Sequence, residues 1–150
     1  MASSTKRRVM RVTAVLMVSA VVLPVGAGEP KEGKDQAKLA KELIGTWVLV
    51  GTPDKVGDPP ESGGRLKFFT GRHWTVTEAD PKTGKVIFHH GGTYTLDGDT
   101  YTETIEYANQ STAALIKKSF KFKVNVEGDK YTQIGVGDNN PYNEVWKRAK

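Results

Sequence analysis

The chain has 150 residues, with 22 Lys and Arg against 17 Asp and Glu, and it contains no Cys. Four of the cations and none of the anions lie in residues 1–27, which leaves 18 against 17 in the remainder. The basic character therefore belongs to the N-terminal segment and gives no reason to expect a nucleic-acid partner. The lack of Cys excludes thiol chemistry, disulfides and a lipid anchor on cysteine.

Residues 1–27 have the pattern of a signal peptide. A positive segment at 6–11 precedes an apolar run at 12–23, Pro24 breaks the run, and Val25-Gly26-Ala27 offers the small residues that a signal peptidase reads. The run is too short for a stable membrane span, which disfavours the alternative of a retained N-terminal anchor. Export without disulfides is typical of a bacterial envelope protein, so we expect a periplasmic or secreted location.

The rest of the chain predicts one all-β domain over residues 35–150. Residues 28–34 are charged and flexible in composition, and Asp35 is placed to cap a short helix that stops at Gly45 and abuts one end of the domain. Short strands then alternate with Gly- and Pro-rich turns, which favours an antiparallel up-and-down barrel of eight strands. We expect these strands at about 46–50, 65–69, 73–79, 85–96, 99–108, 117–126, 130–136 and 143–149.

The Asp97-Gly98 turn predicts which side chains face the barrel interior. An Asp-Gly pair between alternating strands favours a two-residue hairpin turn, which would pair Tyr94 with Tyr101 and His90 with Ile105. Since strand side chains alternate, one face then carries an aromatic set with two ionisable groups, and the other face is rich in Thr. The inward residues expected to bind a ligand are Trp74, His90, Tyr94, Tyr101, Glu103, Tyr107, Phe122 and Gln133.

Two short motifs open and close the strand series. Leu43-Ile44-Gly45-Thr46-Trp47 begins the first strand, and Trp146-Lys147-Arg148 ends the last. With the strand series, they make the chain resemble a lipocalin-like domain of the calycin type, as in uncharacterised bacterial secreted proteins. In lipocalins a Trp of the first strand packs against an Arg of the final barrel strand. The resemblance therefore implies that Trp47 and Arg148 form a structural pair that closes one end of the barrel.

Three functions fit such a domain. The inward aromatic residues with His90 and Glu103 supply apolar area and hydrogen-bonding groups, so we expect noncatalytic binding of a small apolar or amphipathic molecule in the barrel. The second is an isomerase or cyclase that uses His90 and Glu103 as acid and base, although no nucleophile sits in a recognisable motif and we assign no catalytic residue. The third is an interaction protein with a filled barrel that binds through residues 51–64, the longest irregular connection.

The three His residues do not predict a metal site. His89 and His90 are adjacent on one strand and point to opposite faces, so they cannot bind one ion inside the barrel. His89 with Glu106 is explained as a cross-strand polar pair on the outer face. Gly91-Gly92 is not followed by a helix and marks a strand bend or bulge rather than a phosphate loop. We expect no metal and no cofactor, and the sequence leaves a protein partner open.

Overall fold

The computed structural model describes residues 31–138 and 140–150, so the predicted signal peptide at 1–27 lies outside the described residues. Helix α1 runs from Lys31 to Leu43 and thus begins before Asp35, within the segment predicted to be flexible. Of the described helices, none is both long enough and apolar enough to cross a bilayer.

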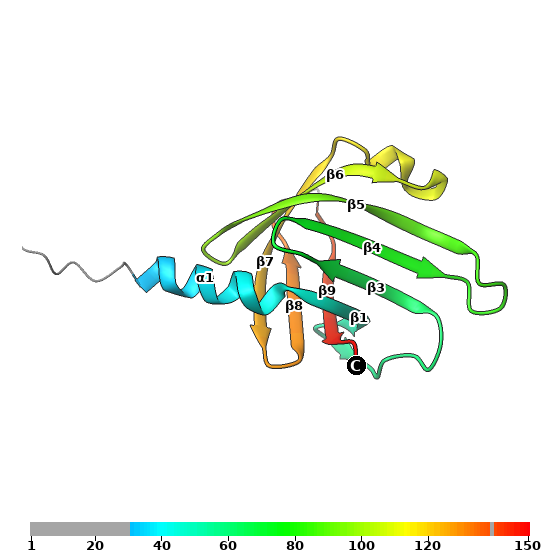
Figure 1. Cartoon of the computed structure of the whole chain (residues 1–150), viewed down its shortest axis with the longest axis horizontal. Coiled ribbons are helices and arrows are strands. Elements are labelled where there is room, and N and C mark those ends of the chain that lie inside the picture. Colours follow the sequence, from blue (N-terminus) through cyan, green and yellow to red (C-terminus); the bar gives the residue numbers. More distant parts are fainter. Residues whose placement is uncertain (1–30, 139) are drawn as a thin grey trace, which may run out of the picture.

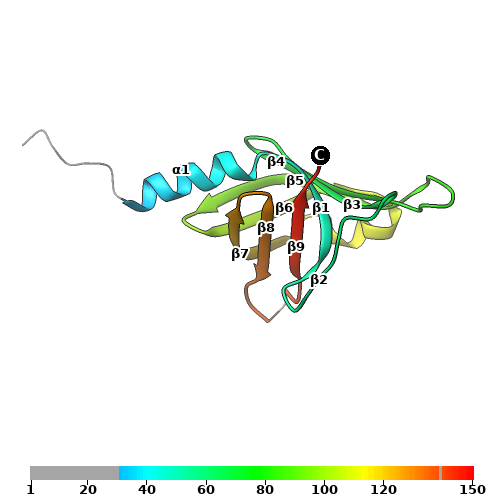
Figure 2. The same cartoon turned by 90° about the horizontal axis from the view of Figure 1, so that it is seen from below.

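Eight antiparallel strands close into a barrel, as the sequence predicts (Figures 1 and 2). They are β1 (Gly45–Thr52), β3 (Gly64–Phe69), β4 (His73–Ala79), β5 (Val86–Asp97), β6 (Thr100–Ala108), β7 (Ser119–Glu127), β8 (Lys130–Gly135) and β9 (Asn143–Arg148). Each strand pairs with the next one in this order, and β1 also pairs with β9, which closes the sheet. The two-residue strand β2 (Lys55–Val56) folds back on the end of β1, inside the connection predicted to be irregular.

The two ends of the barrel differ. Helix α1 lies at one end, and a short 3₁₀ helix, η1 (Gln110–Leu115), lies at the other (Figure 1). At the α1 end the interior is filled, because Phe69 packs against Tyr94, Tyr101 and Tyr131 with ring centroids 5.5–5.7 Å apart. Leu43 is fully buried in the same cluster. The interior toward η1 is therefore the part of the barrel where a molecule can be accommodated.

Trp47 and Arg148 lie together at the α1 end, in the arrangement that the lipocalin resemblance implies. Trp47 is fully buried, and the guanidinium carbon of Arg148 lies 4.1 Å from its ring centroid. The Trp47 indole nitrogen donates a hydrogen bond to the carbonyl oxygen of Leu43 at 2.9 Å. The pair thus joins the last turn of α1, the first strand and the last strand.

The β5–β6 hairpin has a register two residues away from the predicted one. Asp97 pairs with Thr100, so the turn residues are Gly98 and Asp99, and Gly98 has a φ of +58°. A turn with positive φ at its first central residue requires Gly there, whereas the predicted turn would require positive φ at Asp97 as well. A shift of two residues leaves each side chain on its predicted face.

A bulge in the same hairpin confirms the predicted irregularity at Gly91-Gly92 and reverses one predicted orientation. Gly92 pairs with Ile105 and Gly91 with Tyr107, so Glu106 is the extra residue. Beyond the bulge the alternation of β6 is reversed, and Tyr107 is 44% exposed on the outer face instead of pointing inward. Its hydroxyl group lies over Gly91, where an added Cβ would come within 2.4 Å of it.

Gly92→Ala should destabilise the barrel by about 1–3 kcal/mol, as other overpacking substitutions do. An added Cβ would lie 2.1 Å from the carbonyl oxygen of Thr104, a backbone atom that can move only if the bulge opens. Urea unfolding followed by circular dichroism measures the loss. Gly71→Ala is the matched control, because a Cβ there has nothing within 4 Å. Equal unfolding free energies for the two variants would contradict the close packing at the bulge.

Candidate functional site

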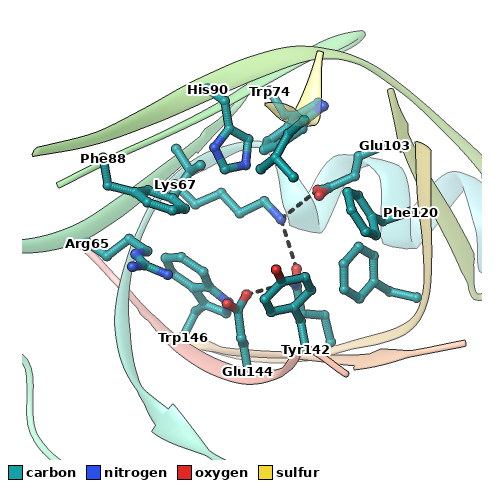
Figure 3. Close-up of a pocket in the computed structure, with 14 residues that line it drawn as sticks. Arg65, Lys67, Trp74, Phe88, His90, Glu103, Phe120, Tyr142, Glu144 and Trp146 are labelled. Carbon is teal, nitrogen blue, oxygen red and sulfur yellow. Dashed lines mark hydrogen bonds and ion pairs between the residues drawn. The ribbon is translucent and has the colours of Figure 1, made fainter. Parts of the chain in front are cut away.

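A cavity of about 250 Å³ occupies the half of the barrel toward η1 (Figure 3). Leu115 of η1 and Tyr142 of the β8–β9 connection line it where it approaches the surface. An eight-stranded barrel leaves room for one small ligand, and this volume is near the lower limit for ligand cavities. The aromatic side chains along its wall are Trp74, Phe88, Phe120, Phe122, Tyr142 and Trp146.

The structure brings five of the eight predicted ligand-binding residues to this cavity: Trp74, His90, Glu103, Phe122 and Gln133. Tyr94 and Tyr101 also face inward, but they belong to the packed cluster at the α1 end. Tyr107 is outside the barrel because of the bulge. Residues 51–64 supply none of the side chains that line the cavity in the described part of the chain, and Asp58 instead pairs with Lys147 at 3.1 Å.

Lys67 is the central polar residue of the interior, and it is not among the ligand-binding residues expected from the sequence. Strand β3 directs it inward, where it is 2% exposed. Its Nζ donates hydrogen bonds to Glu103 Oε2 at 3.1 Å and to Gln133 Oε1 at 2.9 Å. The hydroxyl of Tyr101 donates to the same Glu103 oxygen at 3.0 Å, and that of Tyr131 donates to Gln133. The buried ammonium group is therefore bonded to a carboxylate and to an amide oxygen, and each of these two acceptors also accepts a hydrogen bond from a Tyr hydroxyl.

Aromatic rings surround the same ammonium group. Six ring centroids lie 4.9–6.0 Å from Lys67 Nζ, those of Phe69, Trp74, Tyr101, Phe122, Tyr131 and Trp146. The faces of such rings carry partial negative charge and attract a cation, most strongly where water is excluded. Lys67 thus already occupies an aromatic environment in the wall of the cavity.

His90 lies beside Lys67 as a neutral imidazole. Its ring packs edge-on against Trp74 and Phe88, with centroids 5.4 and 4.9 Å away. Burial, together with the positive charges of Lys67 and Arg65, lowers the pKa of His90 from 6.5 to about 4. Its Nδ1 is buried and has no hydrogen-bond partner among the described residues.

The lowered pKa of His90 makes the folded barrel lose stability as the pH falls from 6.5 toward 4. In that window the unfolded chain binds a proton at this residue and the folded chain does not, so acid favours unfolding. We expect the advantage of the wild type over His90→Gln, in free energy of unfolding, to shrink or reverse across that range. Burial raises the pKa of Glu144, so this residue makes the folded barrel more stable as the pH falls. The wild type and His90→Gln both contain Glu144, so its contribution cancels in the comparison. Parallel pH profiles from urea unfolding would contradict the burial of an uncharged His90.

Glu144 enters the cavity from β9. Its Oε2 accepts a hydrogen bond from Gln133 Nε2 at 2.7 Å. Burial raises the pKa of this carboxyl, the positive charge of Lys67 opposes that rise, and the negative charge of Glu103 adds to it. The indole of Trp146 also lowers the pKa of Glu144. Its nitrogen is buried, but it lies outside hydrogen-bonding geometry with every described residue.

Arg65 stands at the wall near Phe88 and is already paired. Its Nη2 lies 2.8 Å from Glu78 Oε2, and its Nε donates to the same oxygen at 2.9 Å. The guanidinium carbon is 4.0 Å from the centroid of the Phe88 ring. The two side chains of this ion pair are 27% and 29% exposed, so water reaches them.

The described residues hold no group of three or more His, Asp and Glu side chains placed to share a metal ion. The cross-strand pair predicted between His89 and Glu106 does not form, because Glu106 is the bulge residue and accepts a hydrogen bond from the Thr93 hydroxyl at 2.7 Å. His89 instead lies beside the exposed ring of Tyr107, with centroids 5.8 Å apart.

No family model matches the chain, and no curated protein matches its sequence. Two solved structures are similar to it. A lipocalin-like protein from Bacteroides uniformis aligns with a TM-score of 0.53 and 14% identity over 72% of this chain and 99% of that one. An uncharacterized protein from Bacteroides eggerthii aligns with a TM-score of 0.50 and 16% identity over 71% of this chain and 99% of that one. These similarities confirm the lipocalin-like fold predicted from the sequence.

Proposed function

We propose that this protein binds one small amphipathic molecule inside the barrel, without catalysis. The observation that carries this proposal is the cavity of about 250 Å³ inside the barrel, which no side chain of the described residues fills. An eight-stranded barrel is wide enough either to be filled by its own side chains or to hold one small ligand, and the half toward η1 is of the second kind.

The composition of the wall indicates the kind of molecule. Six aromatic side chains provide apolar contact area, and a few polar groups at fixed positions orient what lies between them. A molecule with an apolar body and one polar head matches both features. The volume of about 250 Å³ limits it to a small compound rather than a long lipid chain.

The geometry favours binding over acid–base catalysis. Glu103 already accepts hydrogen bonds from Lys67 and Tyr101 rather than from His90. With a pKa of about 4, His90 is a weak base at neutral pH. Glu103 therefore has other partners than His90, and the two residues do not form the acid–base pair that the sequence suggested.

The proposal also includes export to the periplasm or the medium, which rests on the signal-peptide pattern of residues 1–27. The intact mass of the protein recovered from those fractions tests it. Cleavage after Ala27 leaves Gly28 as the first residue. Recovery of the whole chain from the cytoplasm alone would contradict export.

Filling the cavity from its mouth should abolish binding. Leu115→Trp places a larger side chain at the lining, whereas Ile116→Trp adds the same ring to the next residue, which is 40% exposed. Native mass spectrometry of residues 28–150 shows whether a molecule is retained, and calorimetric titration with phenylbutylamine, phenylbutanol and phenylbutyrate measures binding. We expect one-to-one binding of at least one probe by the wild type and by Ile116→Trp, and loss of binding in Leu115→Trp. If nothing is retained and no probe binds, the proposed function is wrong.

A further inference from the structure

We propose that the molecule bound in this cavity is an organic cation, and that the carboxylate of Glu144 binds its positively charged head. This inference rests on the proposed binding function and names the chemical class of the ligand. The inference follows from the charged side chains along the cavity: the cations are already paired, and one carboxylate has no cationic partner.

Both cationic side chains at the cavity are paired. Lys67 Nζ is bonded to Glu103 and Gln133, and the guanidinium of Arg65 is bonded to Glu78. An anionic ligand would have to displace one of these partners and leave a buried or half-buried carboxylate without its counter-charge. Breaking an ion pair in this way is costly, so the cations do not form an anion site.

Glu144 differs from the other carboxylates. It accepts a hydrogen bond from the neutral side-chain amide of Gln133, and no Lys or Arg of the described chain lies within ion-pair distance of it. Figure 3 shows its carboxylate directed into the space that Tyr142 and Trp146 also line. Glu144 is partly buried, and such a carboxylate gains from a nearby positive charge, because burial penalises its charged form and reduces the water that screens the attraction.

The surrounding rings suit the same head group. Tyr142 packs edge-on against Phe120 with centroids 5.9 Å apart, and both line the cavity with Trp146. Aromatic faces attract ammonium groups, and a carboxylate among them adds a fixed counter-charge. Trp74, Phe88 and Phe122 then offer apolar contacts for the body of the molecule. A primary amine or a larger ammonium group on an apolar body matches both parts.

Three probes with one body and different heads test the inference: phenylbutylamine, phenylbutanol and phenylbutyrate. We expect the wild type to bind the amine about tenfold more tightly than the alcohol, and the carboxylate least tightly, since removing one partner of a desolvated charge pair weakens binding by at least that factor. Quenching of Trp74 and Trp146 fluorescence, with calorimetry, measures the affinities.

Glu144→Gln keeps the size of the side chain and a hydrogen-bonding oxygen for Gln133, but removes the charge. In this variant we expect the amine and the alcohol to bind within about threefold of each other, because the amine loses its counter-charge. Glu127→Gln is the matched control, since it also removes a carboxylate charge. Glu127 is the last residue of β7, is exposed, and does not line the cavity. This control variant should keep the wild-type preference.

The outcomes separate the two proposals. If the alcohol or the carboxylate binds the wild type as tightly as the amine, the cation inference is wrong while the binding function stands. If Glu144→Gln keeps the preference for the amine, Glu144 is not the group that binds the head. If none of the probes binds and no molecule is retained, both proposals fail. The preference of the wild type decides the ligand class even if the variant does not fold.

Discussion

Trp47→Ala should lower the free energy of unfolding by about 3–5 kcal/mol, the range for truncation of a large aromatic core residue. Trp47 is fully buried, its ring centroid is 5.5 Å from that of Tyr131, and its indole nitrogen is bonded to Leu43. The substitution leaves a cavity under Arg148 and removes one of the contacts that join α1 to the barrel, the hydrogen bond to Leu43. Urea unfolding of residues 28–150, followed by circular dichroism, measures the change without depending on the indole signal.

Trp47→Phe is the control for this substitution, because it keeps a ring beneath the guanidinium of Arg148 and loses the hydrogen bond to Leu43. We expect it to be destabilised by less than half as much as Trp47→Ala. Arg148 also donates hydrogen bonds to the carbonyl oxygens of Glu42 and Ile44, so it closes the end of the barrel through the backbone as well as through the ring. A loss below about 1 kcal/mol for Trp47→Ala would contradict a structural role for this pair.

The sequence was sufficient to predict the barrel because local patterns determine it. Side chains alternate along most strands, and turns with Gly or Pro separate them, so strand number and order follow from short-range information. The inward positions of Phe122 and Gln133 follow from the same alternation. Closure of β9 on β1 was predicted because an eight-stranded meander hides its edges by closing into a barrel, and the family resemblance of the first and last strands implies the same closure.

Register was less predictable, because it depends on turn geometry and bulges. The Asp97-Gly98 pair suits a turn with two positive φ angles, but only Gly98 adopts one, and the hairpin shifts by two residues. The bulge at Glu106 could be anticipated from Gly91-Gly92, yet the two Gly residues do not reveal which residue of β6 is the extra one. For that reason the orientation of Tyr107 was wrong while that of Glu103 was right.

The main polar residue of the cavity was not predictable from local pattern. In β3, Lys67 points inward while its neighbours Leu66 and Phe68 lie on the other face, which is the reverse of the usual alternation. A charge among aromatic residues is normally assigned to solvent. The contacts that make its burial possible come from Glu103 and Gln133, which are 36 and 66 residues away in the chain.

Lys67→Met should lower the free energy of unfolding by about 3–5 kcal/mol, because it leaves the carboxylate of Glu103 buried without its counter-charge. Glu103 is 5% exposed, and its remaining hydrogen bond comes from the Tyr101 hydroxyl. The double variant Lys67→Met with Glu103→Gln removes both charges and keeps an oxygen for that hydroxyl. We therefore expect the double variant to be more stable than Lys67→Met alone, as in other proteins where a buried ion pair is replaced as a unit. Urea unfolding of the four proteins of this cycle measures the coupling.

The same double variant also distinguishes the two carboxylates inside the barrel. Glu103 forms an ion pair with the buried Lys67, whereas Glu144 is hydrogen-bonded to the uncharged Gln133 and faces the cavity. If Glu144 binds the head of an organic cation, removal of the Lys67–Glu103 pair should leave the preference for phenylbutylamine over phenylbutanol intact, since the repulsion from Lys67 and the attraction to Glu103 are lost together. Loss of that preference in the double variant, with its retention in Glu144→Gln, would assign the cation to Glu103 instead. The stability cycle and the probe titrations thus test separate functions of two carboxylates in one barrel.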